Sequence, residues 1–205
     1  MKKLLFTLLL CGFVGGSMTY AQQKTETLLG ELSFSGMGSM IEPGMQFTQV
    51  AGETAAYFNI RGGISFNDKW TVGGFYGHLL ADIRPDMLGS QSCNLDSYQT
   101  GGFIEYSPWN SSLVHLSFPV SFGVMEMDRD SYSSLIDDDS PETHSLLLEP
   151  RALAEVNLHR YVRLNAGLGY RIMGRPFQEV AAVPEAGNAL TFQIGLKVGL
   201  FNGID

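Results

Sequence analysis

The sequence contains few cysteines and few charged residues for its length, and both shortages restrict what it can be. Only Cys11 and Cys93 are cysteines among 205 residues, so a fold held by several disulfides is excluded. Charged residues make up 17%, against about 25% in an average soluble domain. Acidic residues outnumber lysine and arginine by 21 to 13, and no basic cluster occurs. This charge distribution argues against nucleic acid as a partner.

Long apolar runs are also missing beyond residue 21, where no segment approaches the roughly 20 residues of a transmembrane helix. The apolar run Leu4–Val14 follows Lys2-Lys3 and precedes a small-residue site at Thr19-Tyr20-Ala21. This pattern predicts a cleaved secretory signal peptide over residues 1–21, leaving 22–205 as the mature domain. Leu10 before Cys11 does not fit a lipidation motif. Cys93 then remains alone in a polar stretch, where we interpret it as an incidental thiol.

Apolar–polar alternation with a period of two is abundant and predicts strands. It is clearest over 114–124, where six apolar residues share one face and His115, Ser117 and Ser121 lie on the other. Equivalent runs cover 56–66, 98–106, 146–157, 162–172 and 190–200. A first strand is expected near Thr27–Met37, and 69–83 is strand-like, with an irregular parity that a bulge at Gly73-Gly74 would explain. The count is eight strands.

The connections between these strands alternate in length. Three are tight, at Asn67–Lys69, Ser107–Ser112 and Leu158–Arg160. Four are long, at Gly38–Gly52, Arg84–Asn94, Met125–Thr143 and Gly174–Gly187. An even number of strands joined in this way predicts an all-β, eight-stranded antiparallel up-and-down barrel of the outer-membrane type, with its short turns on the periplasmic side.

Alternation alone does not say which face points inward, but two features favour a membrane barrel over a soluble one. Aromatic residues gather at the tight-turn ends as one interfacial girdle (Phe66, Trp70, Tyr106, Trp109 and Tyr161), and four tyrosines could form the other (Tyr57, Tyr76, Tyr98 and Tyr170). The polar face carries nearly balanced charges: Glu31, Glu105, Glu149 and Glu155 with Arg61, Arg151, Arg163, Arg171 and Lys197. We expect them to form a structural charge network that fills a narrow lumen.

Several stretches carry a family resemblance: Met45–Gly52, the glycine-rich pair Arg61–Gly63 and Gly73–Gly77, Leu148–Asn157, and Gly169–Arg171. They are similar to uncharacterised outer-membrane β-barrel domains, and nearly the whole mature chain resembles the small eight-stranded barrels typified by the OmpA transmembrane domain and OmpX. The last strand, ending at Leu200-Phe201, resembles the C-terminal signal of such barrels. The resemblance implies the outer membrane of a Gram-negative bacterium, surrounding lipid, the outer-membrane assembly machinery as a partner during biogenesis, and no catalytic residues or cofactor.

Some eight-stranded barrels modify lipid, which makes His78, His115, His144 and His159, with Ser117 and Ser121, catalytic candidates. His115 and both serines are expected to face inward at the periplasmic end, away from the outer leaflet, so we expect no enzyme. The segment Glu126–Glu142 holds seven acids and one arginine. It lacks the spacing of a calcium loop and is interpreted as a solvated surface loop.

The sequence therefore predicts a monomeric barrel with a structural or surface-interaction role, whose long acidic loops would contact an unidentified surface partner. The alternatives are a soluble periplasmic barrel that binds an apolar ligand, a small-solute channel, and a lipid-modifying enzyme.

Overall fold

The computed structural model describes residues 37–50, 53–67, 69–80, 93–131, 143–176 and 188–201. The expected signal peptide, the expected first strand near Thr27–Met37 up to residue 36, and Glu31 lie outside these ranges. The described residues form eight strands: β1 Gly38–Val50, β2 Glu53–Phe66, β3 Trp70–Leu79, β4 Cys93–Tyr106, β5 Val114–Ser131, β6 Thr143–His159, β7 Val162–Pro176 and β8 Ala189–Leu200.

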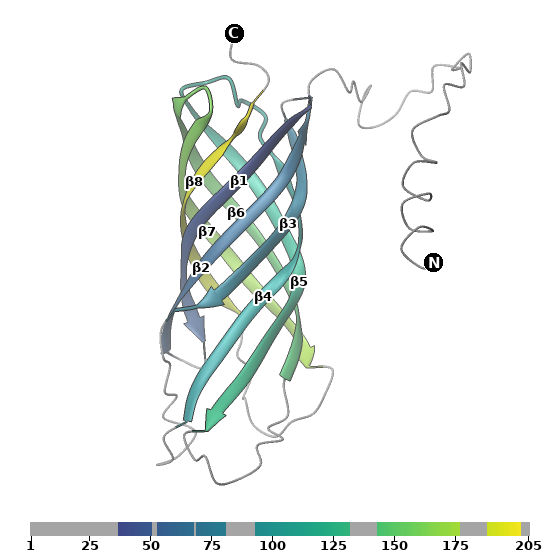
Figure 1. Cartoon of the computed structure of the whole chain (residues 1–205), viewed down its shortest axis with the longest axis vertical. Helices are drawn as coiled ribbons and strands as arrows, with labels where there is room; N and C mark the ends of the chain where they lie inside the picture. Colours follow the sequence, from purple (N-terminus) through teal and green to yellow (C-terminus); the bar gives the residue numbers. More distant parts are fainter. Residues whose placement is uncertain are drawn as a thin grey trace, which may run out of the picture. The chain divides into compact units, whose positions relative to one another are not determined.

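The strands form one closed barrel in which each is antiparallel to its neighbours in sequence, and β8 pairs with β1 (Figure 1). Closure leaves no strand edge unpaired, which removes the usual route to edge-to-edge aggregation. The predicted eight-stranded antiparallel fold is confirmed. No helix among the described residues is long and apolar enough to cross a membrane.

The two ends of the barrel differ in their connections. The short-turn end, as we call it, holds the turns at Asn67–Lys69, Ser107–Leu113 and Arg160-Tyr161, together with the start of β1 and the end of β8. Asn67 has a φ of 49°, a left-handed conformation that asparagine tolerates, and Lys69 N donates to Phe66 O over 3.2 Å to close that turn. We call the opposite end the long-loop end.

The prediction of a long loop at Gly38–Gly52 is wrong. Gly38–Val50 is expected from the sequence to be a long loop, yet it is β1 and pairs with both β2 and β8. Pro43-Gly44 reads as a turn, and proline cannot donate to a sheet ladder. In the β1–β8 ladder the paired positions pass from Ile41 to Gly44, so Pro43 lies where that ladder is interrupted. Only two residues then connect β1 to β2.

Several other boundaries also differ from the prediction. Gly73-Gly74 produces no bulge, because both pair in continuous register with β2 and β4. Cys93 begins β4 and does not lie in a loop, and the Met125–Thr143 connection is shorter than expected because β5 continues to Ser131. The two segments that extend the β4–β5 ladder, Cys93–Asp96 and Asp128–Ser131, pair with each other.

Polar side chains of the strands face inward and large apolar side chains face outward, which is the opposite of a soluble protein. Among the described residues, 24 buried residues are polar or charged and 12 are hydrophobic. Large apolar side chains on all eight strands point outward, and Phe122, Leu168 and Leu190 are 51%, 61% and 71% exposed. Burial of polar groups is tolerated only where they are hydrogen-bonded or paired, so the interior must be an organised network.

Candidate functional site: the charged interior of the barrel

The half of the interior nearer the short-turn end contains a group of ion pairs that we call the lower cluster: Glu42, Arg61, Glu105, Glu155 and Lys197. Arg61 Nη2 donates to Glu105 Oε2 over 2.5 Å, and its Nη1 lies 3.4 Å from Glu42 Oε1. Lys197 Nζ donates to Glu105 Oε1 over 2.6 Å and to Glu155 Oε1. All five residues are at least 98% buried, so each charge depends on its partners.

Glu155 also engages the residues that the sequence offers as catalytic candidates. His115 Nε2 lies 3.0 Å from Glu155 Oε2, and Ser117 Oγ donates to Glu155 Oε1 over 3.0 Å. The second ring nitrogen of His115 faces the carbonyl oxygen of Ser112 at 3.2 Å. Both nitrogens are thus occupied by groups other than the serine hydroxyl, so these side chains are not arranged to activate a nucleophile.

A second group, the upper cluster, lies toward the long-loop end and is built on Glu149. Arg151 Nε donates to Glu149 Oε1 over 2.7 Å, and Arg171 Nε lies 3.4 Å from Glu149 Oε2. Gln46 and Thr191 donate to the same carboxylate over 2.5 and 3.0 Å. One carboxylate therefore serves two buried guanidinium groups, and neutral donors complete its shell.

Side-chain amides link the two clusters and also bond to one another across the barrel interior. Gln193 donates to Glu42 over 2.8 Å and accepts from Arg151 Nη1 over 2.5 Å. Gln99 Nε2 donates to Gln46 Oε1 and Asn59 Oδ1 over 2.8 and 2.9 Å. The hydrogen-bonded network therefore reaches across most of the strands, and most of its links join residues far apart in the sequence.

Inward-facing glycines make room for these hydrogen bonds across the barrel interior. Gly77 pairs with Asn59 on one side and Gln99 on the other. A Cβ at Gly77 would lie 2.0 Å from Asn59 Oδ1 and 2.7 Å from Gln99 Nε2, so only glycine allows these amides to meet. Gly169 has the same role, since a Cβ there would lie 2.6 Å from Arg151 Cγ and 2.6 Å from Thr191 Oγ1.

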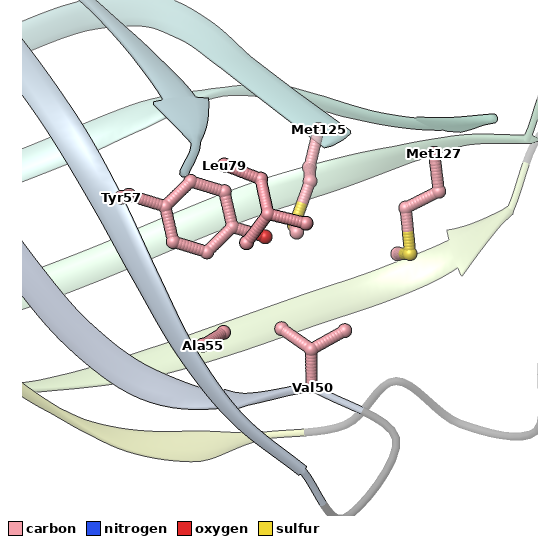
Figure 2. Close-up of a cluster of buried hydrophobic side chains, with 6 residues drawn as sticks. All are labelled: Val50, Ala55, Tyr57, Leu79, Met125 and Met127. Carbon is pink, nitrogen blue, oxygen red and sulfur yellow. The ribbon is translucent and has the colours of Figure 1, made fainter. Parts of the chain in front are cut away.

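The long-loop end of the interior is filled by hydrophobic side chains, which we call the apolar cluster. Figure 2 shows its members gathered between the strands: Val50, Ala55, Tyr57, Leu79, Met125 and Met127. Tyr57, expected from the sequence in an outer aromatic girdle, is instead fully buried, and the Arg171 guanidinium lies 5.1 Å from its ring centroid. The apolar cluster covers the upper cluster at this end.

Eight of the nine residues expected in the interior charge network lie in the described strands. Arg61, Glu105, Glu155 and Lys197 belong to the lower cluster; Glu149, Arg151 and Arg171 belong to the upper cluster. Arg163 is 4% exposed, and its Nη1 lies 3.9 Å from Glu155. Glu31, the ninth, lies outside the described residues.

Glu42 and Gln46 are not among the residues expected in the interior, because the sequence predicts a loop at Gly38–Gly52. The signal was present in the alternation of Ile41, Pro43, Met45 and Phe47 with these polar residues. Glu42 is the fourth acid that balances the interior charges. Among the described residues no group of three histidine, cysteine or acidic side chains is placed to hold a metal ion.

The outward face carries aromatic pairs near both ends. At the short-turn end the rings of Trp70 and Tyr106 are 4.5 Å apart, and toward the long-loop end those of Tyr76 and Tyr98 are 6.3 Å apart. Polar pairs begin just beyond the second pair, where His78 lies 3.8 Å from Asp96. An apolar wall flanked by aromatic rings is thus followed by titratable side chains.

No family model matches the chain, and no curated protein matches it. Solved structures do resemble it. Neisserial surface protein A (NspA) superimposes with a TM-score of 0.56 at 14% identity, covering 82% of this chain and 97% of that one.

The attachment invasion locus protein Ail of Yersinia pestis, in complex with the heparin analogue sucrose octasulfate, gives a TM-score of 0.50 at 16% identity, covering 80% of this chain and 98% of Ail. A major outer membrane protein of Thermus thermophilus gives 0.50 at 12% identity, covering 80% and 98%. Identities this low establish a shared fold and nothing further: the chain has the fold of small outer-membrane β-barrels.

Proposed function

We propose that the protein is an integral outer-membrane β-barrel. The observation that carries this proposal is the inverted polarity of the barrel, with a charged, hydrogen-bonded interior and large apolar side chains facing outward on every strand. In water such a wall would be a large exposed hydrophobic surface, which soluble monomers avoid. In a bilayer it would contact lipid, and closure would satisfy every strand's backbone.

Strand length and aromatic placement support the same proposal. The shortest strand, β3, has 10 residues, and a tilted transmembrane strand needs about 9–11. The Trp70–Tyr106 and Tyr76–Tyr98 pairs occupy the positions expected for interfacial girdles. The runner-up, a soluble periplasmic barrel with an apolar ligand inside, would need an apolar interior, and the described interior is mostly polar.

The finer assignments belong to the same proposal. Residues 1–21 would direct export, and the assembly machinery would insert the barrel as a monomer into the outer membrane of a Gram-negative bacterium. The family description that suits it would be the OmpA/OmpX-like barrels. The resemblance to NspA and Ail supports the proposed fold. The proposed location in the membrane rests on the apolar outer wall of the barrel.

For the physiological role we propose structure or surface interaction, without catalysis. The interior is closed by two ionic clusters and an apolar cluster, so the connections at the long-loop end are left to carry a role. The β5–β6 connection and the strand end before it carry six acidic residues at Asp128, Asp130, Asp137–Asp139 and Glu142. Ail is seen with a polysulfated ligand; this acidic chain would instead favour a cationic or neutral partner.

Fractionation and gel mobility test the membrane placement. The protein should remain with outer membranes after a urea or carbonate wash, and should migrate faster in SDS unless boiled, as folded barrels do. A variant with Val120→Arg on the outward face of β5 should lose about 2–4 kcal/mol of stability in lipid. Leu113→Arg, at the short-turn rim, serves as the matched control with a small effect. Release into the soluble periplasmic fraction would refute the proposal.

Excision of residues 132–142 tests the surface role, because it spares the paired ladder that ends at Cys93 and Ser131. The barrel should keep its gel mobility while adhesion or serum sensitivity changes. An unchanged surface phenotype, combined with altered small-solute uptake in Glu149→Gln or Arg171→Gln, would replace the interaction role with transport.

A further inference from the structure

Buried polar atoms without a hydrogen-bond partner gather beside the lower cluster. Asn165 on β7 is 1% exposed, yet neither Nδ2 nor Oδ1 of its amide has a partner among the described residues. Oε2 of Glu42 likewise accepts no hydrogen bond there, and Lys197 Nζ lies 3.9 Å from it. A buried amide with no partner is costly, so this arrangement indicates an additional polar occupant.

The backbone leaves room for such an occupant. Asn165 pairs with Gly195, which in turn pairs with Gly44, so two of three adjacent interior positions carry no side chain. A Cβ at Gly195 would lie 3.0 Å from both Asn165 Oδ1 and Glu42 Oε1. The glycine thus stands between two polar groups that do not bond to each other.

A small pocket lies at the short-turn end of the interior, on the side of Asn165 where the lower cluster begins. It is lined by Ser65, Thr71, Glu105, Ser107, Asn110, Arg163, Lys197 and Phe201. Arg163 and Lys197 stand two residues from Asn165 and Gly195 on the same interior face, so the unpartnered amide is one interior position beyond the pocket lining. The Phe201 ring lies 3.8 Å from Arg163 Cζ and therefore flanks the entrance.

The charges decide what kind of molecule fits. Three carboxylates (Glu42, Glu105 and Glu155) face three cations (Arg61, Arg163 and Lys197), and His115 also bonds to Glu155. Because these charges already pair with one another, an added ion would have to displace an existing ion pair. The amide of Asn165 offers both a donor and an acceptor, which suits a neutral molecule that can accept and donate.

We propose that this side of the barrel is a one-ended aqueous vestibule. Water and small neutral solutes enter from the short-turn end past Phe201, reach Asn165 and Glu42, and stop at the upper cluster. No side-chain atom of Glu149, Arg151 or Arg171 is unpartnered among the described residues, which is why the upper cluster forms the floor.

Magnetic resonance of the refolded, isotope-labelled protein tests the vestibule without any mutation. The side-chain amide protons of Asn165 should show direct cross-peaks with water. Those of Gln99, buried to the same 1% but bonded to Gln46 and Asn59, should not. Absence of water cross-peaks at Asn165, or equal cross-peaks at both amides, would overturn the proposal.

Cysteine labelling then tests the direction of entry. In a Cys93→Ser chain without residues 1–21, iodoacetamide should modify Asn165→Cys, and Phe201→Ala should raise that rate roughly five- to tenfold, the factor expected when a cation–π contact is lost. Ala55→Cys, in the apolar cluster, is the control whose rate Phe201→Ala leaves unchanged. If Phe201→Ala accelerates both sites equally or neither, entry is not past Phe201 and the vestibule is refuted.

Discussion

Glu149 compensates two buried guanidinium groups at the level of the upper cluster, which makes it the residue whose charge the barrel can least lose. It is fully buried and accepts from Arg151, Gln46 and Thr191. Removal of one partner from a buried ion pair is strongly destabilising, because the remaining charge stays desolvated. Glu149→Gln should therefore lower the free energy of unfolding by about 3–5 kcal/mol, measured by urea titration in detergent micelles.

The matched control for that variant is Glu53→Gln, the same chemical change at an exposed position at the start of β2. It should alter stability by no more than about 0.5 kcal/mol. Equal losses in both variants would mean that the interior is wet enough at Glu149 to screen its charge. Arg151→Leu should behave like Glu149→Gln.

Gly77 offers a second residue-level prediction, because its missing side chain is what lets Asn59 and Gln99 bond. Gly77→Ala would force these amides apart and should cost about 1–3 kcal/mol. Gly62→Ala, on the outward face, should be neutral, since its new Cβ would meet nothing closer than Met40 O at 3.8 Å. The midpoints of thermal unfolding of both variants test this prediction. An unchanged midpoint for Gly77→Ala would contradict the packing argument.

At the scale of elements, β1 is the strand whose position differs most from the sequence-based expectation. Because Gly38–Val50 pairs with β2 and β8, the barrel closes without the segment expected as strand one. A chain lacking residues 22–36 should therefore refold in detergent to a form with the usual gel mobility and an unfolding midpoint within a few degrees of the full mature chain. Failure to form a heat-modifiable barrel would show that these residues belong to it.

The reason seven strands could be predicted and β1 could not is physical. Outward residues such as Leu116, Phe118 and Val120 must all be apolar while their neighbours are polar, so the period-two signal is strong. In β1 the Pro43-Gly44 pair resembles a turn, and the interrupted β1–β8 ladder that accommodates it depends on tertiary pairing.

The interior residues were predictable as a set but not as pairs. Parity assigns Arg61, Glu105 and Lys197 to the inside. Which carboxylate meets which cation depends on the register between strands and on contacts such as Gln46–Glu149, 103 residues apart. Short-range patterns carry no information about such contacts, and the glycines that permit them read as generic strand glycines.

At the scale of the whole molecule, the interior contains three successive layers of side chains: the lower cluster, the upper cluster and the apolar cluster. An eight-stranded barrel encloses only enough space for side chains, and Arg61, Arg171, Tyr57 and Phe103 are among its largest fully buried side chains. Planar-bilayer recordings of the purified protein should therefore show no large, steady conductance. Such a conductance would mean that the ion pairs separate readily in the membrane.

The vestibule proposal sharpens this expectation, because it locates the seal at the upper cluster and not at the apolar cluster. Leu79→Ala with Met127→Ala would open the apolar cluster from the long-loop end but leave Glu149, Arg151 and Arg171 bonded. This double variant should still show no steady current, whereas Glu149→Gln, which frees both guanidinium groups to move, should produce intermittent openings if it folds. A steady current through the Leu79→Ala, Met127→Ala variant alone would show that the apolar cluster is the true barrier and that water already crosses the ionic layers.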